Sequence, residues 1–349
     1  MRRTRMSDAV ELPSTIGPYD VEELLGETPT GPVYRVRRSS GGDPFSLKVL
    51  PSELLDGNER AQRELAKLTQ LHHPCIAQVR DVELRADPPY IVVEYVEGCT
   101  LRELIAERRL SFAEAFRVFH QVCQALDSAH GTGVLHRTLN PSTIMVSRDL
   151  RVVRVIDFAL GALQGGRLDV SSGGTDLMRS MNIAYRAPET LRDGIASSGA
   201  RADVFAAGAV FYELLTGRRP GSRLALPSTQ NSDVPPDLDP LVLRCVAQEP
   251  EERYDGFAQI LGELRALDDR LRLGLSHNLQ GISRTGKVLA TGAVRRLPHP
   301  GVVVASLLAV VALLLLWIGR CAVPAGDAAP PEDSAPASES APSESPTPG

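Results

Sequence analysis

The stretch VLHRTLNPSTIMV, residues 134–146, decides what kind of protein this chain is and what chemistry it can perform. Among its polar side chains, Thr138 and Thr143 carry hydroxyls and Asn140 carries an amide. The stretch contains no acidic residue. It therefore offers no carboxylate that could accept a proton or bind a metal ion, and its meaning depends on the segments around it.

The pattern of apolar residues predicts an α+β fold with two lobes. Short strand-like segments come first, interrupted by one helical segment at about 58–71, and from about residue 100 the apolar residues recur at helical spacing. We therefore expect a domain over 18–267, with a small lobe at about 18–97 and a large lobe at about 98–267. The expected strands are 19–25, 33–36, 45–49, 76–82 and 90–96, and the expected long helices are 112–129, 203–215 and 257–267.

A run without any charged residue, 302–319, predicts a transmembrane helix. A helix of this length measures about 27 Å, close to the hydrocarbon thickness of a bilayer. A buried core helix is the alternative, but such a helix usually carries a polar face and this run has none. Lys and Arg are more frequent before the run than after it. The positive-inside rule thus predicts a single-pass protein of the cell membrane, with its N-terminal domain in the cytoplasm and a short C-terminal tail outside.

The remaining segments have compositions that do not predict a folded domain. The N-terminal tail, 1–17, begins with a basic cluster that no apolar stretch follows, so we do not expect a signal peptide. Residues 268–300 gain Gly, Ser and Arg, which indicates a basic juxtamembrane linker. Residues 320–349 are acidic and rich in Pro, Ala and Ser, and we expect them to be disordered. The net charge of −5 and the lack of a basic patch in the sequence argue against a nucleic-acid partner.

Further motifs surround residues 134–146 in a fixed order. They are LGETPTGPVY (25–34), FSLK (45–48), DFA (157–159), RAPE (186–189) and DVFAAG (203–208). Each alone would be weak evidence, but together, at fitting spacings over 18–267, they resemble the motifs of Ser/Thr protein kinase domains, in particular of bacterial membrane-anchored kinases. In this resemblance residues 134–146 match the catalytic loop H-R-D-x-x-x-x-N, with replacements at its functional positions.

The resemblance implies a nucleotide site whose phosphate-binding loop is altered. Gly26, Gly31 and Val33 match the glycine-rich loop G-x-G-x-x-G-x-V. Thr28 replaces the middle glycine of that motif, and Pro29 lacks the backbone N–H that family members offer to a phosphate. We therefore expect a stiffer loop that binds phosphate less well.

The resemblance also implies which residues contact the rest of the nucleotide. Lys48 matches the strand lysine of the family, and its expected partner is Glu64 in the following helix. In the family this ion pair holds the lysine against the α- and β-phosphates. Two unrelated surface charges are the alternative, but both residues fall in register. The segment that follows the gatekeeper Val93 resembles the hinge, where the backbone groups of Glu94 and Val96 are the expected adenine contacts.

The expected metal site keeps one of its two ligands. Asp157 matches the aspartate of D-F-G, so the resemblance implies that it binds the Mg²⁺ that bridges the phosphates. Ala159 replaces the glycine of that motif and narrows the backbone freedom there. Thr143 stands where the family has an asparagine as second ligand. A hydroxyl can bind Mg²⁺, so the replacement weakens the expected site without removing it.

The positions that carry out phosphoryl transfer in the family are degenerate. Thr138 stands in place of the catalytic aspartate, and Asn140 in place of the lysine that neutralises the transferred group. Asn182 replaces a threonine that touches both groups in Ser/Thr kinases. Since each such effect typically contributes about 10²–10⁴-fold, their joint loss predicts negligible or very slow transfer.

Residues that hold the large lobe together in the family are kept. Glu189 is expected to form a buried ion pair with Arg253. Asp203 is expected to accept hydrogen bonds from the backbone of the catalytic loop. His136 and Phe158 are expected to lie in the apolar spine that connects the lobes.

The sequence therefore favours a membrane-anchored pseudokinase that signals by binding a protein partner, with ATP and Mg²⁺ as candidate ligands. Two alternatives stay open. One is a slow, unconventional Ser/Thr kinase that uses Lys48, Asp157 and one Mg²⁺, and the other is a membrane scaffold that binds no nucleotide. At the start of the membrane run, Gly301, Ala305 and Ala309 recur every four residues, a spacing that a dimer of helices can use.

Overall fold

The computed structural model describes part of the chain, namely residues 12–28, 30–163, 183–195, 199–221 and 224–271. Within these ranges, no helix is both long and apolar enough to cross a membrane. The predicted transmembrane run and the tail that follows it lie outside the described residues, as do Pro29, Asn182 and the linker from residue 272 onward. All described residues belong to the first of two compact units, 1–288 and 289–349.

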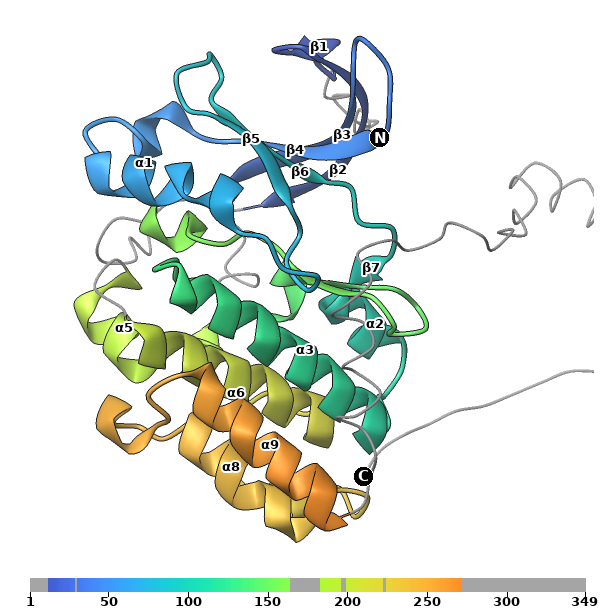
Figure 1. Cartoon of the computed structure of the whole chain (residues 1–349), viewed down its shortest axis with the longest axis vertical. Helices are drawn as coiled ribbons and strands as arrows, with labels where there is room; N and C mark the ends of the chain where they lie inside the picture. Colours follow the sequence, from blue (N-terminus) through green and yellow to red (C-terminus); the bar gives the residue numbers. More distant parts are fainter. Residues whose placement is uncertain (1–11, 29, 164–182, 196–198, 222–223, 272–349) are drawn as a thin grey trace, which may run out of the picture. The chain divides into compact units, whose positions relative to one another are not determined.

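A six-stranded antiparallel sheet forms the small lobe, in the order β1-β2-β3-β4-β6-β5 (Figure 1). One face of this sheet buries an aromatic cluster, in which the Tyr19 ring meets the edges of Phe45 and Tyr90 at centroid distances of 6.2 and 6.1 Å. Val33 is paired with Lys48 across β3 and β4. The register therefore places the lysine beside the end of the glycine-rich motif. The strands are β1 (Thr15–Ile16), β2 (Tyr19–Thr28), β3 (Gly31–Arg38), β4 (Pro44–Val49), β5 (Val79–Glu83) and β6 (Tyr90–Glu94).

The small lobe carries one α-helix, α1 (Glu59–Ala66), which is shorter than predicted. Asn58 caps its N-terminus, because the Asn58 side chain accepts a hydrogen bond from the Ala61 N–H at 3.1 Å. At Lys67 the helix tightens, since the Lys67 N–H bonds to the carbonyl of Glu64, three residues back, as well as to that of Leu65. A 3-10 turn, Leu68–Gln70, follows in place of the last predicted helical turn.

The large lobe is helical and carries a small sheet, β7-β8-β9, on the side that faces the small lobe (Figure 1). Capping boxes start two of its helices: Thr100 and Glu103 cap α2, and Ser111 and Glu114 cap α3. The strands are β7 (Cys99–Thr100), β8 (Ile144–Val146) and β9 (Val153–Val155), and the helices are α2 (Leu101–Glu107), α3 (Phe112–Gly131), α5 (Pro188–Asp193), α6 (Ala200–Thr216), α7 (Pro227–Gln230), α8 (Asp239–Cys245) and α9 (Phe257–Leu271).

Helix α6 forms the centre of the large lobe, and it is buried continuously from Ala202 to Thr216. Its Phe211 ring stacks on Phe119 of α3 at a centroid distance of 3.9 Å. On another side, α8 approaches so closely that a Cβ on Gly208 would lie 2.4 Å from the Cβ of Cys245. Because α6 is packed on all sides, its Asp203 has a fixed position from which it binds the backbone of the catalytic loop.

The predicted two-lobed α+β fold is confirmed, with differences at the ends of its elements. α9 runs to Leu271, so Asp268, which was assigned to the linker, lies buried in the domain. β1 lies within the predicted N-terminal tail and pairs with β2. The predicted strand 76–82 begins only at Val79, because Ile76 makes a single bridge to Val155 of the large lobe instead.

Candidate functional site

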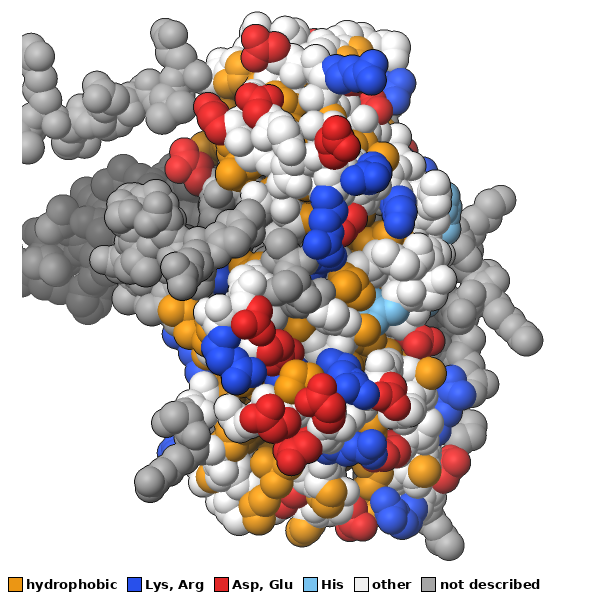
Figure 2. Space-filling model, turned by 90° about the vertical axis from the view of Figure 1, so that its left-hand side faces the viewer, with side chains coloured by type: hydrophobic (Ala, Val, Ile, Leu, Met, Phe, Trp, Pro, Cys, Tyr) orange, Lys and Arg blue, Asp and Glu red, His pale blue; other side chains and the backbone are white. Residues whose placement is uncertain are grey.

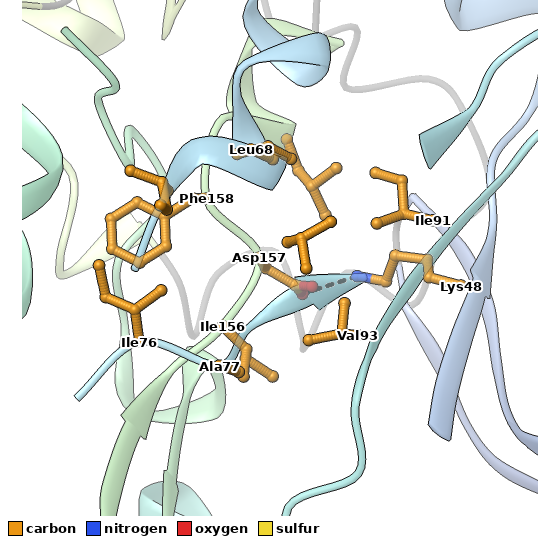
Figure 3. Close-up of a pocket in the computed structure, with 12 residues that line it drawn as sticks. Lys48, Leu68, Ile76, Ala77, Ile91, Val93, Ile156, Asp157 and Phe158 are labelled. Carbon is orange, nitrogen blue, oxygen red and sulfur yellow. Dashed lines mark hydrogen bonds and ion pairs between the residues drawn. The ribbon is translucent and has the colours of Figure 1, made fainter. Parts of the chain in front are cut away.

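A cavity lies between the small-lobe sheet and the segment that contains Asp157 (Figure 3). It encloses about 30 Å³, room for about two water molecules and far less than a nucleotide requires. Its walls are mainly apolar, with Leu68, Val93 and Phe158 among them, and Lys48 and Asp157 are its charged groups. In this conformation the cavity is therefore too small to hold a nucleotide.

Lys48 is paired with Asp157 and not with Glu64. The Lys48 ammonium lies 2.6 Å from Oδ2 of Asp157, and the two side chains are 6% and 24% exposed (Figure 3). The predicted ion pair between Lys48 and Glu64 is therefore wrong for this structure. The opposite charges of Lys48 and Asp157 neutralise each other.

Glu64 instead binds the catalytic loop. Its carboxylate lies 2.9 Å from Nη2 of Arg137, whose side chain is 4% exposed, and 3.3 Å from Nε of Arg60. Burial lowers the pKa of Arg137, and the charge of Glu64 opposes that effect. A buried guanidinium needs a carboxylate nearby, which explains why Glu64 turns toward Arg137.

A short 3-10 turn after Asp157, Leu160–Ala162, helps to hold α1 in this position. The side-chain amide of Asn58 donates to the carbonyl of Ala162 at 3.3 Å. Gly161 packs directly onto the catalytic loop, because a Cβ at this residue would lie 2.7 Å from the Cβ of Arg137 and 3.1 Å from the methyl carbon of Thr138. Thr138, in the position of the catalytic base, is thus half-buried beside the turn that contains Gly161.

At the degenerate positions of the catalytic loop, the side chains of Asn140 and Thr143 bond to the loop itself. Asn140 accepts a hydrogen bond from the Ser142 N–H at 2.8 Å and donates to the carbonyl of Thr138 at 2.8 Å. The Thr143 hydroxyl donates to the Asn140 carbonyl at 2.9 Å and accepts from the Asn140 N–H at 3.1 Å. Together they form a capping box on the 3-10 turn Pro141–Thr143. The side chains of Asn140 and Thr143 therefore stabilise the loop.

The glycine-rich motif forms a tight hairpin end. The Thr28 hydroxyl donates to the carbonyl of Gly31 at 2.7 Å, which closes the turn from within. Gly31 has φ of +119°, and a Cβ there would lie 2.0 Å from the carbonyl oxygen of Val49. In contrast, a Cβ on Gly26 would have open space around it. Gly31 is thus required for close packing of the hairpin on β4.

The segment that was predicted to be the hinge is fixed by contacts of Glu94. The backbone N–H of Glu94 donates to the carbonyl of Gln78 at 2.9 Å. The Glu94 carboxylate lies 3.0 Å from Nε of Arg154 on β9, so this side chain connects the lobes. Val96 lies two residues beyond Glu94, the last residue of β6. The backbone groups of Glu94 and Val96 stay a prediction as adenine contacts.

Asp203 on α6 holds the backbone of the catalytic loop, as predicted. Its carboxylate accepts hydrogen bonds from the N–H groups of His136 at 2.8 Å and Arg137 at 2.6 Å, and lies 2.8 Å from Nε2 of His130. Burial alone would raise the pKa of Asp203, but these hydrogen bonds lower it below its usual value. The His136 ring contacts Phe158 at a centroid distance of 4.8 Å, which is consistent with the predicted spine.

Glu189 and Arg253 form the predicted ion pair. Their bidentate contacts measure 2.6 and 2.8 Å, and the Arg253 side chain is completely buried. Arg253 also donates to the carbonyls of Ala247, Gln248 and Arg201. The pair therefore fixes α5, and with it the end of the activation segment, to the large lobe.

One buried polar cluster was missed by the sequence analysis. Arg102 of α2 donates to Glu213 of α6 at 3.1 Å and to the hydroxyl of Tyr185 at 2.6 Å, and Tyr185 donates to Glu213. Burial and the charge of Glu213 raise the pKa of Tyr185. The three residues come from separate elements, and nothing in their spacing along the chain signals the contact.

The side chains around Asp157 do not fit the Mg²⁺ site that the family implies. Mg²⁺ prefers several oxygen ligands in octahedral geometry, of which proteins usually supply one or two carboxylates. Here the Asp157 carboxylate already neutralises Lys48, and the Thr143 hydroxyl is bonded within the catalytic loop. Among the described residues, no group of three or more His, Cys, Asp or Glu side chains could hold a metal ion.

The two lobes, the glycine-rich hairpin, the strand lysine and the buried supports of the catalytic loop define a protein kinase domain. The chain belongs to the protein kinase family, since the family model described as protein kinase domain matches residues 19–280. Members of this family bind ATP together with Mg²⁺.

The curated relatives are bacterial serine/threonine-protein kinases. The chain is 31% identical over 269 residues to PknB of Mycolicibacterium smegmatis and 32% identical over 271 residues to PknB of Mycobacterium tuberculosis. In both cases the match covers 70% of this chain but only 42% of the relative. The chain therefore matches less than half the length of these kinases.

Solved structures show the same fold. The PknI kinase domain of Mycobacterium tuberculosis is 26% identical, with a TM-score of 0.58, and the match covers 72% of this chain and 99% of that chain. A structure of Rad53 in complex with AMP-PNP is 22% identical, with a TM-score of 0.55, and covers 70% of this chain and 64% of that chain. The second likeness concerns the fold alone.

Proposed function

We propose that this chain is a pseudokinase, a kinase-fold module that signals by binding a protein partner and not by phosphoryl transfer. The observation that carries the proposal is the catalytic loop, in which the side chains of Asn140 and Thr143 are bonded within the loop itself and the Thr138 backbone carbonyl accepts one of these bonds. A kinase needs a carboxylate at the first of these positions and a cation at the second. Thr138 supplies no carboxylate, and the Asn140 side chain is neutral and caps the loop together with Thr143.

The intact scaffold supports a binding role. Asp203 still holds the catalytic loop, and the pair of Glu189 with Arg253 still fixes the end of the activation segment. These contacts maintain the surfaces by which kinase domains meet other proteins. A chain that keeps its buried supports while its transfer residues change is suited to recognition by shape.

We further propose that the module binds an adenine nucleotide, with Lys48 near the phosphates and the backbone of Glu94 and Val96 near the base. Support comes from the position of Lys48 opposite Val33 and from the hinge contacts described above. Titration of the full chain with ATP in a thermal-shift assay tests this proposal. We expect a rise in melting temperature that Lys48→Ala abolishes. Equal melting temperatures with and without ATP would leave the scaffold alternative.

The assay that tests the pseudokinase proposal is phosphoryl transfer from labelled ATP. The full chain, purified in mild detergent, is expected to label neither itself nor a generic protein substrate above an Asp157→Ala control. Label incorporation that depends on Asp157 would establish the second candidate, a slow Ser/Thr kinase. That candidate is favoured by one observation, the close approach of Lys48 to Asp157.

We also propose that residues 302–319 anchor the module in the cell membrane, with the kinase-like domain in the cytoplasm and the tail 320–349 outside. The uncharged run and the basic residues before it support this arrangement. Protease treatment of intact cells should remove an epitope placed at residue 349 and spare one at residue 1. Helix pairing through Gly301, Ala305 and Ala309 would add a dimer contact, which cross-linking in the membrane can detect.

Figure 2 bears on the kind of partner. Over the lower half of the face that it shows, Lys and Arg side chains alternate with Asp and Glu, and they do not gather into one basic area (Figure 2). A mixed surface of this kind is suited to a protein partner, whereas nucleic acid requires a continuous basic surface. We therefore propose a protein partner and no nucleic acid.

A further inference from the structure

We propose that the nucleotide site of this chain works without a divalent metal ion, with the Lys48 ammonium supplying the positive charge that the phosphates need. The inference rests on the proposed nucleotide binding, and it adds which group neutralises the phosphates of the nucleotide. It follows from the poor fit of a Mg²⁺ ion to the side chains that the structure describes around Asp157.

The two expected metal ligands, Asp157 and Thr143, are already bonded to other groups. Asp157 keeps its carboxylate, but that carboxylate lies 2.6 Å from the Lys48 ammonium. Thr143 has its hydroxyl bonded on both sides, as donor to the carbonyl and as acceptor from the N–H of Asn140. A Mg²⁺ ion would therefore depend on one carboxylate that another cation already shares.

Glu64 carries the other carboxylate that the family motif places near Lys48. Glu64 points away from the site, because it lies 2.9 Å from the buried guanidinium of Arg137. A buried arginine holds a nearby carboxylate strongly, because breaking a buried ion pair is costly. Glu64 is thus not available to complete a metal site, and it does not compete for Lys48 either.

The Asp157 carboxylate can either strengthen or weaken ATP binding, depending on whether a metal ion is present. In a metal-dependent site the aspartate strengthens ATP binding, because it holds the ion that bridges the phosphates. Without a metal ion the same carboxylate repels the phosphates and competes with them for Lys48. Removing the Asp157 charge should therefore weaken ATP binding in a metal-dependent site and strengthen it in a site without a metal ion.

Isothermal titration calorimetry of the full chain with ATP, in mild detergent, distinguishes these situations. Each titration is run once with excess MgCl₂ and once with EDTA. We expect the same Kd under both conditions. We also expect Asp157→Asn to bind ATP about tenfold more tightly in EDTA, the effect of one like charge removed at short range. Asp233→Asn removes one exposed carboxylate from a loop of the large lobe and is the matched control, with an unchanged Kd.

The outcomes separate the inference from the proposed function. Binding that needs Mg²⁺ and is weakened by Asp157→Asn would overturn the inference and leave nucleotide binding in place. No heat of binding under either condition would overturn both. Asp157→Ala serves as a second variant, and the melting temperature of each variant without ligand shows that it is folded. Tighter binding in either Asp157 variant supports the inference.

Discussion

The Glu64 carboxylate lies 2.9 Å from the guanidinium of Arg137, and this contact connects α1 of the small lobe to the catalytic loop of the large lobe. Lys48 pairs with Asp157 in the same structure. Each buried charge thus has an opposite charge beside it, although not the partner that the family motif implies. The contact of Glu64 with Arg137 therefore contributes to the stability of the domain and to the position of α1.

Replacing Glu64 by glutamine should lower the free energy of unfolding by about 2 kcal/mol, because the buried Arg137 loses its nearby carboxylate. Arg60→Gln is the matched control. Arg60 contacts the same carboxylate at 3.3 Å, but its side chain is 60% exposed. Its loss should therefore cost less than about 0.5 kcal/mol. Urea denaturation of the full chain, followed by circular dichroism, measures the unfolding free energy of both variants. An equal decrease in the two variants would contradict a structural role for the ion pair of Glu64 with Arg137.

The triple variant Thr138→Asp, Asn140→Lys and Thr143→Asn should gain detectable phosphoryl transfer from labelled ATP. It returns the carboxylate, the cation and the amide oxygen that the family uses. The variant should also lose about 1 kcal/mol of stability, because the capping box of the loop disappears. The same triple variant with Asp157→Ala is the control. If the triple variant stays as inactive as this control, the catalytic loop alone does not limit phosphoryl transfer. The glycine-rich hairpin or the position of α1 would then limit it.

Much of the fold and its supports could be predicted from the sequence. Asp203, Glu189 and Arg253 each stand in a motif whose place in the kinase fold is fixed, so their partners follow even across 64 residues of chain. The capping of the catalytic loop also has a local signal. Asn140 followed directly by a proline is typical of the start of a short helix, and a side chain three residues later can return the bond.

The partners of Lys48 and Glu64 could not be predicted from the sequence. Two pairings of the same charges are electrostatically reasonable, namely lysine with either Glu64 or Asp157. Which one forms depends on where α1 packs, and this in turn depends on the 3-10 turn Leu160–Ala162 and on Asn58, which binds it. Such long-range packing leaves no periodic signal in the chain.

Replacing Glu189 by alanine should destabilise the domain by about 3–5 kcal/mol, because Arg253 would be left as an uncompensated buried charge. The Arg253 side chain is 0% exposed. Glu107→Ala is a suitable comparison, since Glu107 and its partner Arg148 are 52% and 73% exposed and lie 2.9 Å apart. That exposed pair should contribute less than about 1 kcal/mol. A similar loss of unfolding free energy in both variants would show that Arg253 finds sufficient partners in backbone carbonyls.

His120 should make the domain sensitive to mild acid. Its ring is buried in α3, and neither ring nitrogen has a hydrogen-bond partner among the described residues. Burial, together with Arg265 of α9, lowers the pKa of His120 to about 4, while Asp268 opposes the shift. An unfolded histidine has a pKa of about 6.5. Between these values the unfolded chain binds a proton that the folded chain does not bind.

Stability should therefore be fully present above about pH 6.5 and should decrease as the pH falls toward 4, by about 3 kcal/mol in total for this one group. His120→Phe removes the titrating group and should flatten that part of the stability profile, whatever its effect at neutral pH. His72→Gln replaces an exposed histidine and should leave the profile unchanged. Urea denaturation at several pH values between 4 and 7.5 measures the slopes. A His120→Phe profile as steep as that of the unaltered chain would mean that other groups cause the acid sensitivity.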